Sequence, residues 1–65
     1  MVQLYLRPRD LKKCERSFRS KIAVRLTGLD GDGEVIAVRG VVKALESGHT
    51  QFQGYPLRIT IPDAE

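Results

Sequence analysis

Strict alternation of apolar and polar side chains near both ends of the chain is the feature that most restricts its fold. In residues 2–6 and 57–61 every second residue is Val, Leu or Ile. A period of two places alternate side chains on opposite faces of an extended backbone. Both segments therefore predict strands that bury one face. Pro8 and Pro62 end them, because proline cannot donate a hydrogen bond to a strand ladder.

The middle of the chain predicts a hairpin. Residues 21–26 alternate in the same way, and the connection at 28–33 contains three glycines and two aspartates, a composition typical of tight turns with positive φ angles. The second arm, from Glu34 to about Leu45, holds continuous apolar runs on either side of Arg39-Gly40. We interpret it as a strand buried on both faces, with a bulge or sharp bend at the glycine. Residues 50–53 predict a further short strand, followed by a turn at 54–56.

Helical spacing competes with alternation in residues 10–19. Asp10 can cap a helix, and Leu11, Cys14 and Phe18 then fall on one face. Residues 18–20 also fit the alternation that follows them, so they remain open between helix and strand. A helix of about two and a half turns is marginal alone and depends on packing.

These elements predict a mainly β protein that occupies residues 1–65 as a single domain. We expect a small curved sheet or partly open barrel of four or five strands with a short N-terminal helix. The alternative is an open α+β sheet with the helix on one face. A domain of 65 residues buries only about 60% of the surface that its unfolded chain exposes, so its stability is expected to be marginal.

The single cysteine and the single histidine exclude several kinds of site. Cys14 has no intrachain disulfide partner, and with His49 alone it leaves a zinc ion short of ligands. We interpret Cys14 as a buried core residue and place His49 in a solvated loop. The acidic turn at 30–34 lacks the closing glutamate of a calcium loop, and its charges would repel phosphate. No Ser/His/Asp set is evident. We expect no catalytic site, no cofactor and no metal.

The sequence also lacks the marks of export or membrane insertion. The first nine residues have no apolar stretch typical of a secretory signal, and no segment approaches the roughly 20 apolar residues that span a bilayer. We therefore expect a cytoplasmic protein with a reduced thiol and no membrane contact.

Positive charge is concentrated at the start of the chain. Residues 1–25 contain eight basic and two acidic residues, a net charge of +6, whereas residues 26–65 contain three basic and six acidic residues, a net charge of −3. On the two predicted strands, Tyr5 and Arg7 share the face opposite the apolar set, as do Lys21 and Arg25. We therefore expect an aromatic ring and several cations on one solvent-facing surface.

Basic side chains contact phosphates, and rings or guanidinium planes stack on bases. We expect a non-enzymatic module that binds an anionic macromolecule, nucleic acid in the first place, through a basic N-terminal face. Its candidate residues are Tyr5, Arg7, Arg9, Lys12, Lys13, Arg16, Arg19, Lys21 and Arg25. The alternative is a protein-interaction or assembly module, a homo-oligomer or accessory subunit, in which the +6 and −3 segments of neighbouring copies attract each other.

Overall fold

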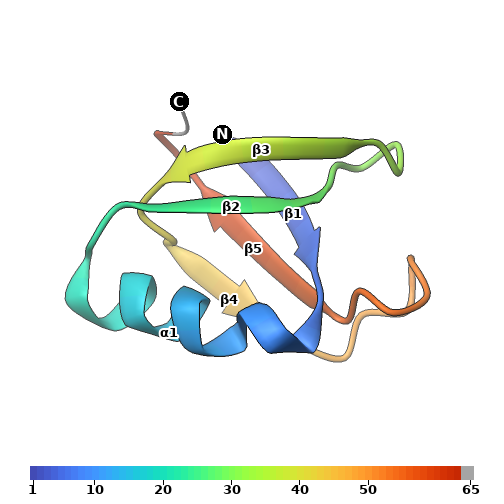
Figure 1. Ribbon diagram of the computed structural model, residues 1–65, viewed down its shortest axis with the longest axis horizontal. Coiled ribbons are helices and arrows are strands. Elements are labelled where there is room, and N and C mark those ends of the chain that lie inside the picture. Colours follow the sequence, from blue (N-terminus) through green and yellow to red (C-terminus); the bar gives the residue numbers. More distant parts are fainter. Residues whose placement is uncertain (64–65) are drawn as a thin grey trace.

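One antiparallel sheet dominates the computed structural model, which describes residues 1–63. The sheet contains β1 (Val2–Leu6), β2 (Val24–Leu29), β3 (Val35–Gly40), β4 (Ala44–Glu46) and β5 (Leu57–Ile61), in the order β3-β2-β1-β5-β4 (Figure 1). Between β1 and β2 the chain forms a 3-10 turn, η1 (Pro8–Asp10), and the helix α1 (Leu11–Ser20). The predicted mainly β fold, with a short helix near the start of the chain, is confirmed.

The connection between β3 and β4 shows how strongly the sheet is curved. These strands lie at opposite edges of the sheet, yet only residues 41–43 separate them. So short a connection reaches about 14 Å from Gly40 to Ala44 when fully extended, so the sheet curls until its two edges approach each other. No ladder joins β3 to β4 in the described part of the chain, and the sheet remains open rather than closing into a barrel. The single strand expected from Glu34 to about Leu45 is wrong, because the chain leaves β3 after Gly40 and continues as β4 at the other edge. Burial on both faces is also wrong for β3, since its residues 35, 37 and 39 are exposed.

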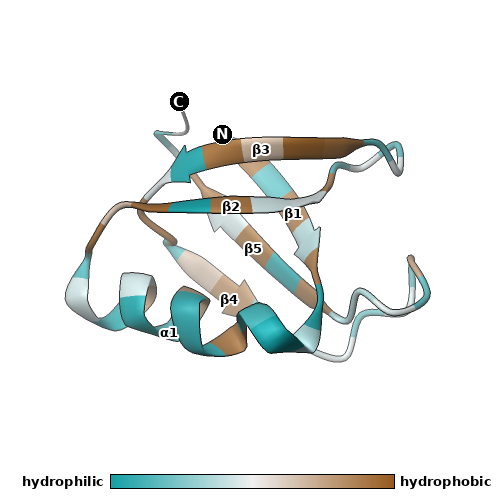
Figure 2. Cartoon of the chain, in the orientation of Figure 1, coloured by the Kyte–Doolittle hydropathy of each residue, from teal (hydrophilic) through white to brown (hydrophobic). Residues whose placement is uncertain are grey.

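The concave inner face of the sheet forms the hydrophobic core. The register pairs Leu4 with Ile59, Leu6 with Leu57, and Leu26 with Val38 across neighbouring strands. The buried core residues are Leu4, Leu6, Cys14, Leu26, Val38, Val42, Leu57, Ile59 and Ile61. Figure 2 shows the alternation of hydrophobic and hydrophilic residues along β5 that predicts this arrangement.

Helix α1 packs against the core through its middle rather than through its two large apolar residues. Cys14 and Ser17 are buried, whereas Leu11 and Phe18 remain 36% and 45% exposed. The predicted apolar face of Leu11, Cys14 and Phe18 is therefore only partly correct. The helix includes residues 18–20 and ends at Lys21, whose φ of 55° is left-handed.

Two further predicted strands differ from the structure. The strand expected from Lys21 begins at Val24, because the left-handed Lys21 and the irregular residues after it carry the chain from α1 to the sheet. Lys21 and Arg25 therefore do not share a strand face. Residues 50–53 form bends and a turn instead of a strand, whereas the turn expected at Gly54 is present with a φ of 84°.

Candidate nucleic-acid interface

The outer face of the sheet, opposite the core, carries one row of side chains that crosses all five strands. Cross-strand pairing links Val35 to Leu29, Leu29 to Tyr5, Tyr5 to Arg58, and Arg58 to Glu46. The loop of residues 47–56 covers the middle of this row, whereas Val35 is 70% exposed at the β3 edge. The outer face is therefore closed over β1 and β5 and open over β2 and β3.

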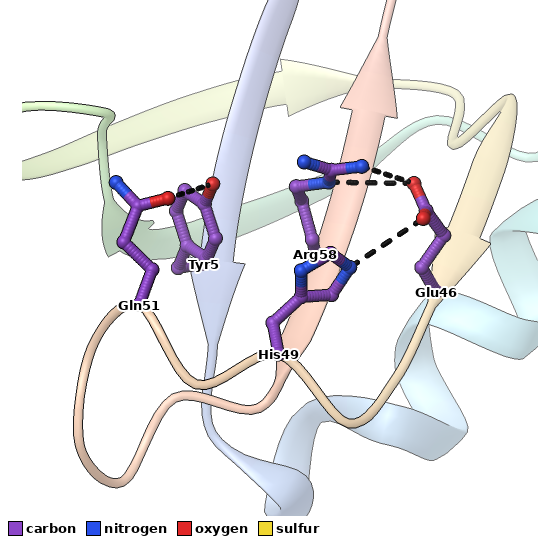
Figure 3. Close-up of polar contacts among 5 residues, drawn as sticks. All are labelled: Tyr5, Glu46, His49, Gln51 and Arg58. Carbon is purple, nitrogen blue, oxygen red and sulfur yellow. Dashed lines mark hydrogen bonds and ion pairs between the residues drawn. The ribbon is translucent and has the colours of Figure 1, made fainter.

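Tyr5 lies beneath that loop. Its hydroxyl donates a hydrogen bond to Gln51 Oε1 at 2.7 Å (Figure 3). The rings of Phe52 and His49 meet the Tyr5 ring edge-on, at centroid distances of 4.9 and 6.1 Å. Only 5% of Tyr5 is exposed. The prediction that Tyr5 faces solvent is wrong, because the loop covers the strand face on which alternation places it.

An ion-pair network fixes the loop at its start. Arg58 donates to Glu46 Oε1 from Nε and Nη2, at 3.3 and 2.8 Å, and His49 Nε2 lies 3.4 Å from Glu46 Oε2 (Figure 3). The hydrogen bond from Arg58 lowers the pKa of Glu46, and the same bond raises the pKa of Arg58. His49 thus lies in a loop, as predicted, but packs against Tyr5 and Glu46.

Arg7 contacts an aromatic ring, that of Tyr55, which the sequence does not place beside it. Arg7 Cζ lies 5.3 Å from the centre of that ring, and Arg7 Nη2 donates to the Tyr55 hydroxyl at 3.1 Å. The two side chains line a hollow of about 210 Å³ together with Arg9, Asp10, Thr27, Gly28, Leu29 and Val35. This hollow places two guanidinium groups and one ring beside exposed apolar surface.

A second group of cations lies on α1. Lys12, Arg16 and Arg19 fall on the side of the helix opposite Cys14, and Lys13 lies beside them. All four are exposed, and we call them the helix stripe. At 1.5 Å per residue the stripe is about 10 Å long. Within residues 1–63, one member of the stripe approaches a carboxylate: Arg19 lies 3.9 Å from Glu15.

Arg25 points outward from β2 directly opposite Arg39 of β3. Both are exposed, and together with Ala37 and Val38 they line a hollow of about 290 Å³. Within the described residues neither guanidinium forms an ion pair. We name the outer surface of this hairpin the hairpin face; it comprises Arg25, Thr27, Leu29, Val35, Ala37 and Arg39.

The predicted site residues thus fall into separate groups. The structure brings Arg7 and Arg9 together, gathers the helix stripe on α1, and pairs Arg25 with Arg39. Lys21 stands apart, at the end of α1, beside Phe18 and Lys43. In Figure 1, α1 and the β2–β3 hairpin occupy opposite sides of the view.

Sequence reasoning missed two residues that belong with these groups. Arg39 is found by the register of the hairpin, since a turn centred on residues 30–34 pairs 29 with 35 and hence 25 with 39. Nothing local identifies Tyr55, because its partner Arg7 is 48 positions away.

The remaining chemical groups take part in structure. Burial raises the pKa of the Cys14 thiol to about 11 and keeps it protonated, as expected for a core residue.

In residues 1–63 no three potential ligands from His, Cys, Asp and Glu gather around a point that would hold a metal ion. Within the same residues, no helix has the length and apolar character needed to cross a bilayer. Comparison with protein-family models, curated proteins and solved structures finds no match to this chain.

Proposed function

We propose that the protein is a non-catalytic module that binds nucleic acid through the basic side chains of residues 7–25. One observation carries this proposal. All eight basic side chains of that segment are exposed, and Arg19 is the one that approaches a carboxylate of the described residues, at the long distance of 3.9 Å. Exposed cations without acidic partners are free to contact phosphates, which supply most of the affinity for nucleic acid.

The arrangement suits a polyanion better than a small anionic ligand. The cations are spread over η1, α1 and β2 instead of converging on one enclosed pocket. Phosphates repeat along a nucleic acid backbone, so separate groups of cations each find a partner. Arg7 and Tyr55 add a guanidinium and a ring, the pair of groups that stacks on bases.

Salt-dependent binding tests this proposal. Fluorescence anisotropy with labelled DNA and RNA of mixed sequence is expected to show affinity that falls steeply with salt. If four cations contact phosphates of duplex DNA, the log-log slope is about −3.6, and affinity drops about 10²-fold between 50 and 200 mM salt. The absence of binding at low salt would eliminate the proposal.

A matched pair of variants locates the binding surface. Lys12→Gln with Arg16→Gln removes two charges from the helix stripe and leaves good helix formers in place. Lys43→Gln removes one exposed charge outside residues 7–25. We expect the helix variant to reduce the slope on duplex DNA by about 1.8 if both cations contact phosphates, and the control to leave it unchanged.

A second candidate function, protein assembly, has its own supporting observation. An open hollow of about 390 Å³ lies beside the half-exposed Phe18, with Val41, Val42 and Pro62 on its apolar lining and Lys21, Lys43 and Asp63 around it. Exposed apolar surface of this kind is typical of interaction sites. Light scattering is expected to give a mass above the monomer that Phe18→Gln reduces. A monomeric wild-type protein at high concentration would eliminate self-assembly.

A further inference from the structure

We propose that a single strand of nucleic acid lies along the hairpin face, between the Arg25–Arg39 pair and the Arg7–Tyr55 pair. This inference rests on the proposed function, and it adds Arg39, Tyr55 and the apolar centre of the hairpin to the binding surface. It also assigns single-strand binding to a different side of the molecule from the helix stripe (Figure 1).

Two like charges oppose each other at one end of the hairpin face. Arg25 and Arg39 are direct cross-strand neighbours on an exposed face, an arrangement that destabilises a hairpin. No carboxylate of the described residues pairs with either one. A phosphate placed between the two guanidinium groups would relieve their repulsion and accept hydrogen bonds from both. The hollow of about 290 Å³ between them leaves room for such a group.

The hairpin face is uncharged beyond the Arg25–Arg39 pair. Thr27 lies opposite Ala37, and Leu29 lies opposite Val35, so two successive cross-strand pairs carry no charge. Val35 is 70% exposed although it is apolar. At roughly 3.3 Å per residue, Leu29 lies about 13 Å from Arg25 along the strand. This length offers an apolar surface to bases beside the Arg25–Arg39 pair. Because the acidic turn at 30–34 follows Leu29 directly and repels phosphate, the strand leaves the hairpin there toward Arg7 and Arg9.

A hollow lies at the far end of the hairpin face. It joins Leu29 and Val35 of the hairpin to the Arg7–Tyr55 pair and to Arg9. Its volume of about 210 Å³ is below the roughly 300–1,000 Å³ of pockets that enclose a whole small molecule, so it suits one planar group. A base stacked on Tyr55 or on the Arg7 guanidinium would lie there, with Arg9 beside it for a phosphate.

These features favour a single strand over a duplex. In a duplex the bases remain stacked inside and phosphates line the outside, so the apolar pairs of the hairpin face would meet charged groups. A single strand offers its bases to apolar and aromatic surfaces and its phosphates to cations. The hairpin face offers cations for phosphates and then apolar pairs for bases, and the adjoining hollow offers the Tyr55 ring for stacking.

The experiment measures anisotropy of a labelled oligothymidylate of about 12 nucleotides, with a duplex of equal length as comparison. We expect Arg39→Gln and Arg25→Gln each to weaken oligothymidylate binding about 5- to 10-fold, and Lys43→Gln to change it less than twofold. The double variant of Arg25 and Arg39 should reduce the salt slope by about 1.4. Tyr55→Leu should weaken binding at least about fivefold with an unchanged slope, because it removes stacking and no charge.

Folding and specificity controls keep the test decisive. Arg39→Gln removes a like-charge contact, so its melting temperature should equal or exceed that of the wild type, and lost affinity then reflects lost contact. Polyglutamate of matched charge should compete poorly. Equal competition by polyglutamate would instead identify a surface for acidic proteins and overturn the inference.

The possible failures are distinguishable. If the wild-type protein binds duplex and oligothymidylate but Arg39→Gln behaves like Lys43→Gln, the single-strand path is wrong while the proposed function stands. Equal weakening of duplex and oligothymidylate binding by Arg39→Gln would also overturn it, because the hairpin face would then not distinguish a single strand. If the wild-type protein binds no nucleic acid at low salt, both proposals fail together.

Discussion

Ser17 Oγ joins α1 to the connection between the two sheet edges, because it accepts a hydrogen bond from the Val42 backbone N–H at 3.0 Å. The same hydroxyl donates to the Ile22 carbonyl oxygen at 2.6 Å. Ser17 is fully buried, so one polar side chain satisfies an amide and a carbonyl from two other segments.

We predict that Ser17→Ala lowers the free energy of unfolding by about 2–3 kcal/mol, because it leaves the buried Val42 amide without its partner. Urea denaturation followed by circular dichroism measures the loss. Ser20→Ala is the matched control, since Ser20 is exposed on the same helix, and it should be nearly neutral. A Ser17→Ala protein as stable as the control would contradict this role.

Gly28 lies where β2 meets β1, and a side chain there has no room. A Cβ at this position would come 2.5 Å from Leu6 Cδ2 and 2.6 Å from the Tyr5 carbonyl oxygen. Because the second contact is with backbone, we expect Gly28→Ala to destabilise the protein by about 1–3 kcal/mol. Gly31→Ala provides the control, because no atom lies within 4 Å of its added Cβ. Thermal unfolding of the two variants compares them, and equal melting temperatures would refute the steric argument.

Stability should fall in acid partly through Glu46. Its pKa is lowered in the folded protein, chiefly by the hydrogen bond from Arg58. A lowered folded pKa gives stability that is present above the unfolded value of about 4.3 and is lost as pH falls through the folded value. Urea midpoints between about pH 6 and pH 3 should therefore decline less in Glu46→Gln than in the wild type. Parallel pH profiles would show that the pair with Arg58 contributes nothing to stability.

Cys14 should be chemically inert in the folded protein. Burial raises the pKa of its thiol to about 11, so very little thiolate exists near neutral pH. We expect a disulfide reagent to label it at least about 10²-fold more slowly than an unstructured cysteine, and at the same rate once urea unfolds the chain. Rapid labelling under native conditions would contradict the burial of Cys14 between α1 and the core.

The strands that the sequence predicts correctly are those in which apolar side chains alternate every second residue. Residues 57–61 form β5 with the predicted bounds, because a strand paired on both sides in a curved sheet buries one face and leaves the other for polar residues. The end of β3 at Gly40 falls at the glycine where the sequence indicates an interruption, but the continuation to Leu45 as the same strand is wrong. The start of β2 does not follow from a local signal, because the alternation from Phe18 onward fits two conformations, and burial of Ser17 in α1 decides between them.

The candidate site was harder to predict, because its contacts are long-range. Tyr5 alternates correctly with Leu4 and Leu6, but its exposure depends on a loop more than 40 residues later in the chain. The pairing of Arg7 with Tyr55 has the same origin. Only Arg39 was within reach of sequence reasoning, since hairpin register follows from the position of the turn.

The central position of β1 has a consequence for synthesis of the chain. β1 pairs with β2 on one side and with β5 on the other, and Val2 lies opposite Ile61. A strand made first therefore remains half-paired until residues 57–61 have left the ribosome, and β4, which pairs only with β5, has no ladder before then. Folding of the sheet is therefore completed only after residues 57–61 are synthesised, when β5 pairs with β1 on one side and with β4 on the other.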